Sequence, residues 1–209
     1  MDIKLLDSTF ILHHFGSLFW PEKELLIIAD VHLGKIEHFR KHGNALPNLT
    51  NAWDYIRIEQ NIAEFNPKHV VFLGDLFHST LNKSWLIFEQ WVVRQPVEFT
   101  LIMGNHDIIP TQQFRDLGFN VLEVLHLDGF SFTHIPEDLE DTFNICGHVH
   151  PGFKLRGKGK QYLGLSCFHQ KEHQLILPAF GDFTGNYYVT PEKGEHIYVL
   201  SENSVMQVV

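Results

Sequence analysis

Short apolar runs and amphipathic segments alternate along the first part of the chain. The runs are rich in Val, Ile, Leu and Phe, and each ends at a polar residue or a turn, as buried strands do. We expect strands at residues 9–15, 25–29, 70–73, 99–103, 121–127, 130–133 and 143–146. The first two are joined by a turn around residues 21–23, and the Asp128-Gly129 turn pairs 121–127 with 130–133.

Helices are predicted between several of these strands. Trp85, Phe88 and Trp91 recur at helical spacing, in a segment that Asn82 can cap and that ends before Pro96. The other expected helices are 35–43, 112–117 and a longer one from a cap at Asn48 or Thr50 to Phe65.

The order of these elements indicates the fold class. From Gly152 onward the chain changes to strands and turns, with glycines as punctuation. Strands alternating with helices, followed mostly by strands, predict an α/β fold of two stacked mixed β-sheets flanked by helices. The 209 residues suffice for one core and are few for two, so we expect a single domain over residues 1–209.

Composition excludes several classes of protein. Hydrophobic residues make up 44% and charged residues 20%, as in an ordinary globular protein. The net charge of -9 argues against a protein that coats nucleic acid through a basic face, although a local basic patch is compatible with it.

Cys146 and Cys167 form no Cys-x-x-Cys pair, which favours two free thiols. The first residues resemble no secretory signal and no run of 18 apolar residues occurs, so we expect a cytoplasmic protein without a membrane segment.

Histidine is unusually frequent, with 15 residues against 16 lysines and arginines combined. Histidine is a common metal ligand, so its positions carry the most information. Five polar clusters directly follow predicted strands, where an open sheet presents ligands to a crevice. They are Asp30-Val31-His32, Gly74-Asp75, Gly104-Asn105-His106-Asp107, His134, and Gly147-His148-Val149-His150.

The chemistry of these clusters indicates a metal site. Carboxylate oxygen, amide oxygen and imidazole nitrogen suit Mn²⁺, Fe or Zn²⁺, and a set without cysteine argues against a closed structural zinc site. In Asp-x-His and His-x-His, alternate residues of an extended segment point the same way and can converge on one metal. The glycines permit close backbone approach just before a ligand. Templates for a nucleophile elbow, a phosphate-binding loop or a dinucleotide turn are missing from the sequence.

The ordered set resembles the calcineurin-like metallophosphoesterase superfamily over roughly residues 25–150. The resemblance implies that a two-metal site, with Mn²⁺ as the first expectation and Fe or Zn²⁺ as alternatives, hydrolyses a phosphoester by in-line attack of a metal-bridging hydroxide. It places Asp30, His32 and His150 on one cation, Asn105, His134 and His148 on the other, and Asp75 between them. It makes His106 the proton donor or transition-state stabiliser, and Asp107 is expected to orient an imidazole.

A narrower resemblance rests on residues 29–35, 73–79 and 177–185, which are similar to those of ligase-associated DNA damage response phosphoesterases. It implies a phosphodiesterase or nuclease that acts on single-stranded or damaged DNA in bacterial repair, with a DNA ligase and a helicase as functional partners. Two alternatives stay open: a phosphomonoesterase acting on a protein, nucleotide or metabolite, and a non-catalytic repair subunit that keeps metals for folding.

Support for nucleic-acid contact from the residues themselves is limited to two basic groups and one aromatic segment. The basic groups are Lys154, Arg156, Lys158 and Lys160, and Lys35, Arg40 and Lys41. Each group either meets backbone phosphates or has a structural explanation. The first would then be a solvated turn, and the second would complement the dipole at the carboxyl end of a helix. Phe180 and Phe183 either offer base stacking beside the site or belong to a packed loop.

Overall fold

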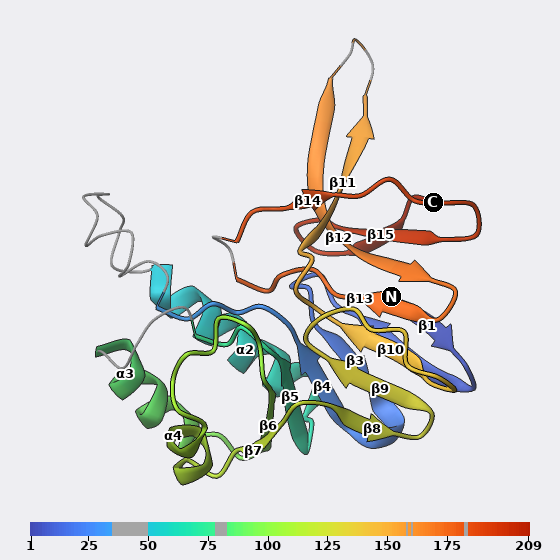
Figure 1. Ribbon diagram of the computed structural model, residues 1–209. Coiled ribbons are helices and arrows are strands. Elements are labelled where there is room, and N and C mark those ends of the chain that lie inside the picture. The colour runs from blue at the N-terminus through green and yellow to red at the C-terminus, as the bar shows by residue number, and fades with distance from the viewer. Residues whose placement is uncertain (35–49, 78–82, 158, 160, 182–183) are drawn as a thin grey trace.

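The computed structural model describes residues 1–34, 50–77, 83–157, 159, 161–181 and 184–209. Two β-sheets lie against each other, and the described helices gather on one side of the molecule (Figure 1). Several predictions concern residues outside this set. They are the helix at 35–43, the caps at Asn48 and Asn82, the basic residues Lys35, Arg40, Lys41, Lys158 and Lys160, and the aromatic residue Phe183.

The first sheet has seven strands in the order β1-β2-β3-β4-β5-β6-β7. Their bounds are β1 Asp2–Leu5, β2 Ser8–Leu12, β3 Leu18–Trp20, β4 Leu25–Ile28, β5 His69–Leu73, β6 Glu98–Ile102 and β7 Asn120–Leu122. Strands β1 to β4 are antiparallel to their neighbours, whereas β4 to β7 run parallel. The sheet is therefore mixed, as predicted.

The second sheet has nine strands, with β14-β11-β12-β13-β10-β9-β8 as its main path and β15 and β16 branching from β12. Their bounds are β8 Leu125–Leu127, β9 Phe130–Thr133, β10 Phe143–Cys146, β11 Pro151–Arg156, β12 Tyr162–Lys171, β13 Gln174–Ile176, β14 Tyr187–Tyr188, β15 His196–Leu200 and β16 Val205–Gln207. Strands β9, β10 and β13 are parallel, and most other pairs are antiparallel.

Strand alternation divides the core into two main layers. Leu26 and Ile28 of β4 face a cluster that contains the buried residues of the helices α2 Thr50–Phe65, α3 Lys83–Val92 and α4 Thr111–Asp116. Leu25 and Ile27 point the other way, into a cluster shared with the second sheet. This period of two places helices on one face of the first sheet and the second sheet on the other. The α/β fold of two stacked mixed sheets is confirmed.

The structure also corrects parts of the strand assignment. Residues 121–127 are not one strand: β7 pairs with β6 in the first sheet, whereas β8 pairs with β9 in the second. A single apolar run thus crosses between the two sheets, which its composition does not reveal. Residues 9–15 likewise hold only β2, and β3, joined to β4 by the 3₁₀ turn Pro21–Lys23, lies between β2 and β4 in the sheet.

None of the helices in the described part of the chain combines the length and apolar character that a membrane crossing requires.

Candidate metal centre

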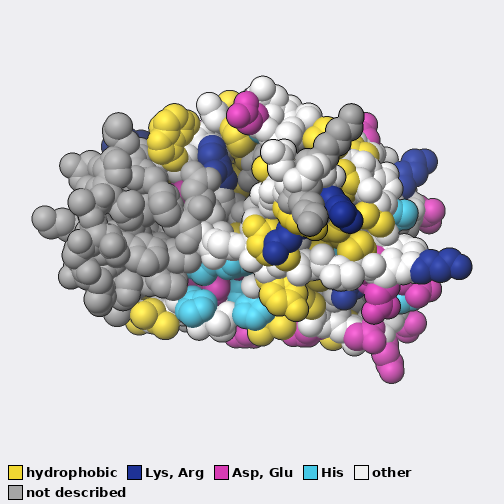
Figure 2. All heavy atoms as spheres, turned by 90° about the horizontal axis from the view of Figure 1, so that it is seen from above, with side chains coloured by type: hydrophobic (Ala, Val, Ile, Leu, Met, Phe, Trp, Pro, Cys, Tyr) yellow, Lys and Arg dark blue, Asp and Glu magenta, His cyan; other side chains and the backbone are white. Residues whose placement is uncertain are grey.

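All five polar clusters lie at the carboxyl ends of parallel strands. Asp30, Asp75 and Asn105 follow β4, β5 and β6 of the first sheet, and His134 and His148 follow β9 and β10 of the second. The two sheets therefore present their ligand-bearing ends to one place, although the clusters are far apart in the sequence. Figure 2 shows histidine and acidic side chains gathered there on the molecular surface.

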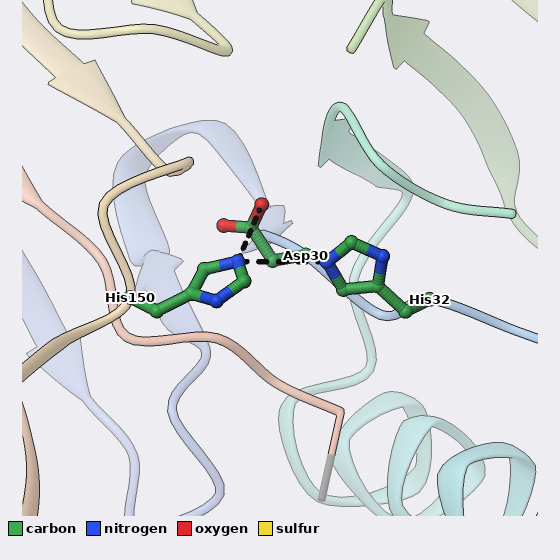
Figure 3. Close-up of side chains that lie close together, drawn as sticks. All are labelled: Asp30, His32 and His150. Atoms are coloured by element: carbon green, nitrogen blue, oxygen red, sulfur yellow. Dashed lines mark hydrogen bonds and ion pairs between the residues drawn. The ribbon is translucent and has the colours of Figure 1, made fainter. Parts of the chain in front are cut away.

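One group of candidate ligands consists of Asp30, His32 and His150, whose ligand atoms all lie within 4.8 Å of one another. The Nε2 atoms of His32 and His150 are 3.5 Å apart, and His150 Nε2 lies 3.2 Å from Asp30 Oδ1. The three side chains point toward one another from two loops, one after β4 and one after β10 (Figure 3). The other carboxylate oxygen of Asp30 accepts a hydrogen bond from the His148 amide at 2.8 Å, which joins these loops.

The second group consists of Asp75, His134 and His148, again with ligand atoms within 4.8 Å of one another. His134 Nε2 lies 3.1 Å from His148 Nδ1 and 2.9 Å from the amide oxygen of Asn105. The structure thus brings Asn105 to this group, as the sequence predicts.

Asp75 lies between the two groups. Its Oδ1 is 3.4 Å from His134 Nε2, and its Oδ2 is 3.7 Å from His32 Nε2. Asp75 is almost completely buried, so its negative charge is held in a place of low dielectric constant next to three histidines, His32, His134 and His148. This is the geometry expected of a carboxylate shared by two cations.

The atoms that face His134 Nε2 fit the binding of a metal cation better than a hydrogen bond. His134 Nδ1 lies 2.9 Å from the carbonyl oxygen of Leu73, so Nδ1 carries the proton and donates it there. Nε2 then has a lone pair that faces the Asn105 amide oxygen, which is itself an acceptor. With the proton on Nδ1, these are two acceptors at 2.9 Å, which repel each other unless a metal cation or a second proton lies between them. The carbonyl of Leu73 therefore fixes the tautomer that a metal requires.

The first group fits a cation as well. Asp30 Oδ1 is buried and accepts no hydrogen bond among the described residues, which is costly for a carboxylate unless a cation neutralises it. Two nitrogen ligands at ~2.1 Å from one ion are about 3.0–3.4 Å apart, close to the separations observed in both groups. Burial, and then the neighbouring His134, lower the pKa of His148, which favours the neutral imidazole that binds metals.

The backbone of the ligand loops is left-handed. Asp30, His32, Asp75, His148 and His150 all have φ between 49° and 68°. Such a conformation costs an L-residue of order 1 kcal/mol and is typically concentrated at functional sites. The expected extended geometry of Asp-x-His and His-x-His is therefore wrong. The paired side chains converge because both residues of each pair are left-handed and not because the segment continues a strand.

Glycines permit the crowding around these ligands. A Cβ on Gly104 would collide with the Asp75 amide, and a Cβ on Gly147 would lie 2.5 Å from Asp30 Oδ2. Both glycines precede a predicted ligand, so the expected close backbone approach is confirmed.

A sequence match identifies the family to which this chain belongs. The model of the calcineurin-like phosphoesterase family matches residues 24–187, which hold every candidate ligand. This chain belongs to that family. It is therefore a phosphoric ester hydrolase. The family depends on two metals, and the structure has two candidate metal-binding groups.

One solved structure agrees with this assignment along the whole chain, and a second is less similar. The Pseudomonas putida nuclease MPE shares 27% sequence identity with the phosphoesterase, at a TM-score of 0.82, over 100% of this chain and 99% of that chain. The Escherichia coli phosphoesterase Yfce shares 15% identity at a TM-score of 0.45, over 88% of this chain and 97% of the other. None of the curated proteins matches this chain.

Asp107 of the phosphoesterase connects two ligand loops. Its Oδ2 accepts hydrogen bonds from the amides of Asp75 and Gly104, both at 2.9 Å, and its Oδ1 accepts from those of Leu76 at 2.9 Å and Phe77 at 3.2 Å. Burial raises the pKa of Asp107 to about 6, and the amides oppose that shift. These contacts make Asp107 a positioning residue for the loops of Asp75 and Asn105. Orientation of an imidazole by Asp107 stays a prediction.

Asp107→Asn tests this positioning role. The amide group of asparagine would place an N–H₂ against backbone donors, so at least one of the loop contacts would be lost. We expect metal affinity to fall by about 10–100-fold, as it does when groups that support metal ligands are removed. Titration with Mn²⁺, followed by the shift in Tm, measures this. The control is Asp116→Asn, which removes the same charge from an exposed position in α4. Equal Mn²⁺ affinities in the two variants would contradict the positioning role of Asp107.

Phe180 and Gly181 support the loop of Asp30. The amide of Phe180 donates to the carbonyl of Ala29 at 2.9 Å, and that of Gly181 donates to the carbonyl of Asp30 at 3.1 Å. Phe180 is only 1% exposed and belongs to the core, so base stacking by Phe180 is excluded and the packed-loop alternative holds for it.

Arg57 is a positioning residue that the sequence interpretation missed. Its guanidinium donates to the Phe180 carbonyl and lies 4.4 Å from the Phe180 ring centroid. A signal exists in retrospect: Arg57 and Asn61 share the inward face of α2 with Ile58, so polar residues interrupt an apolar stripe.

Proposed function

We propose that this phosphoesterase is a metal-dependent phosphodiesterase that cleaves nucleic acid. The observation that carries the proposal is the pair of ligand groups joined by Asp75, in a chain that matches the Pseudomonas putida nuclease MPE along its full length. A phosphodiester is the bond that a nuclease breaks, and two adjacent cations suit its negative charge.

The residues of the site have distinct roles in this reaction. Asp30, His32 and His150 would hold one cation, and Asn105, His134 and His148 the other, with Asp75 shared. When bound, the cations supply Lewis acidity, a water of lowered pKa and a clamp for in-line displacement. Asp75 Oδ1 also accepts the amide of His106 at 2.9 Å, which fixes the His106 backbone beside the site. We propose that His106, which is exposed, gives a proton to the leaving oxygen.

Mn²⁺ is the proposed native metal. The ligands combine carboxylate and amide oxygens with imidazole nitrogens, a set intermediate between the oxygen cages of Mg²⁺ and thiolate sites. Fe and Zn²⁺ accept the same ligands and are the alternatives.

A role in bacterial DNA repair, beside a DNA ligase and a helicase, is proposed from the three-segment resemblance. The contacts of Phe180 and Gly181 with the Asp30 loop support it, because they give the described part of the segment that distinguishes this branch a role next to the site. We further propose that residues 1–209 act as one domain.

One set of assays tests the proposal. Purified protein is mixed with bis(p-nitrophenyl) phosphate, p-nitrophenyl phosphate, single-stranded DNA or double-stranded DNA, each with Mn²⁺, Mg²⁺ or Zn²⁺. We expect Mn²⁺ to give the fastest cleavage of the diester and of single-stranded DNA. Preference for the monoester would select the phosphomonoesterase alternative. Metal binding with no turnover of any substrate would select the non-catalytic alternative.

A further inference from the structure

A β-hairpin leaves the second sheet directly after the candidate metal ligand His150. Strand β11 begins at Pro151 and returns as β12, and the pair projects beyond the rest of the molecule (Figure 1). The amide of Tyr187, at the start of β14, donates to the carbonyl of His150 at 2.9 Å. The hairpin and β14 are therefore anchored at the metal centre.

The two sides of this hairpin differ in chemistry. Register pairs Lys154 with Gly164 and Arg156 with Tyr162, and Gly152 pairs with Tyr188 of β14. Because directly paired residues point to the same side, Lys154, Arg156, Tyr162 and Tyr188 share one side, which we call the hairpin face. Phe153, Leu155 and Leu165 point to the opposite side and pack against a small apolar cluster. The hairpin face is therefore not needed for the core.

Aromatic and basic groups meet on the hairpin face. Lys154 Nζ lies 4.4 Å from the ring centroid of Tyr188, and the ring occupies the space that a side chain at Gly164 would fill. Tyr162 is 62% exposed and Tyr188 44%, so both tyrosines present ring surface to solvent. Exposed aromatic rings next to cations are the elements with which proteins stack unpaired bases and hold their phosphates.

The charge around the hairpin face is opposite to that of the whole chain. The net charge is -9, yet residues 151–166, which span the hairpin, contain no Asp or Glu and four lysines and arginines. A phosphate polymer is repelled by the protein as a whole but attracted along this stretch. Figure 2 shows lysine and arginine side chains together with hydrophobic ones on the surface near the histidines.

We propose that the hairpin face binds single-stranded nucleic acid and leads it to the metal centre. Lys154 and Arg156 contact backbone phosphates, and Tyr162 and Tyr188 stack on bases, which requires that these bases be unpaired. At ~3.3 Å per strand residue, Lys154 lies about 13 Å and Arg156 about 20 Å along the strand from His150. This inference rests on the proposed function and specifies where the substrate strand binds.

The test compares a long and a short diester. The Mn²⁺-loaded protein cleaves a fluorescein-labelled oligothymidylate of about 12 nucleotides, which reaches the hairpin, or bis(p-nitrophenyl) phosphate, which does not. For Lys154→Ala/Arg156→Ala we expect kcat/KM on the oligonucleotide to fall about tenfold or more, mainly through KM. The slope of log kcat/KM against log salt should become shallower by about 1.4, as for two lost phosphate contacts. The factor by which kcat/KM falls on the oligonucleotide should be at least ten times the factor by which it falls on the short diester.

A second variant tests stacking. Tyr188→Ala should lower kcat/KM on the oligonucleotide by about 5–100-fold, since one stacked base is lost, and Tyr188→Phe should retain most of it. Wild-type kcat/KM in Tyr188→Ala would overturn the assignment of stacking.

The control variant is Lys68→Ala/Arg94→Ala, which removes the same charge from exposed positions at the amino end of β5 and after α3. It should cleave the oligonucleotide as the wild type does. An equal loss in both double variants, or wild-type KM and salt slope in Lys154→Ala/Arg156→Ala, would overturn the inference. Wild-type protein active on the short diester but not on DNA would overturn it too and leave the diesterase activity standing. Wild-type protein inert toward both would overturn the proposed function itself.

Discussion

Asp75→Asn is expected to abolish turnover and to empty both cation sites together. Asparagine has nearly the same shape as aspartate, so it fills the buried space and its amide oxygen can still accept the hydrogen bond from His106. What it removes is the negative charge between the two ligand groups, because Oδ1 lies near His134 and Oδ2 near His32. Without that charge, two divalent cations in one buried place would repel each other with little compensation.

We expect a loss of kcat of about 10³-fold or more, since the cations contribute several kcal/mol to stabilising the transition state. Elemental analysis after gel filtration in Mn²⁺ measures bound metal, and hydrolysis of bis(p-nitrophenyl) phosphate measures kcat. Bound metal should fall from two ions per chain to less than one. Two bound ions in Asp75→Asn would show that Asp75 does not bridge them.

His150→Ala is the informative comparison for this variant. His150 contacts Asp30 and His32 but belongs only to the first group, so its loss should empty one site and leave the other. If Asp75→Asn and His150→Ala retained the same amount of metal, the two groups would be coupled through more than Asp75.

The order of the polar clusters could be predicted from the sequence because each follows a strand. An apolar run that ends at Asp30 or Asp75 identifies both the strand and the edge at which its ligand emerges. His134 is predicted on the same ground, although it has no neighbouring motif residue. The structure places these residues in two groups, but their roles as ligands and that of His106 stay predictions until metal binding is measured.

Other features could not be predicted because they depend on tertiary contacts. Whether residues 121–127 stay in one sheet is decided by strand partners distant in sequence. The four amides around Asp107 come from two loops that meet only after folding. The left-handed backbone at Asp30 and His32 is likewise imposed by the surrounding contacts, since neither residue type favours it strongly.

His106→Ala is expected to lower kcat on DNA by about 10²–10⁴-fold, the usual contribution of a positioned general acid. His106 is held through its backbone amide by Asp75, and its ring centroid lies 6.0 Å from that of His32. Because its ring belongs to neither ligand group, the variant should bind both cations with affinity close to that of the wild type. Titration with Mn²⁺ and elemental analysis measure this retention.

The leaving group distinguishes proton donation from simple charge stabilisation. A dinucleotide releases a strongly basic alkoxide, whereas bis(p-nitrophenyl) phosphate releases a phenolate that is stable without a proton. If His106 protonates the leaving oxygen, His106→Ala should cost the dinucleotide at least tenfold more than the phenolate diester, because only the alkoxide needs the proton. Equal losses on both substrates would instead assign His106 to stabilising the charge of the transition state. His126→Ala, an exposed histidine on β8, should leave both rates unchanged.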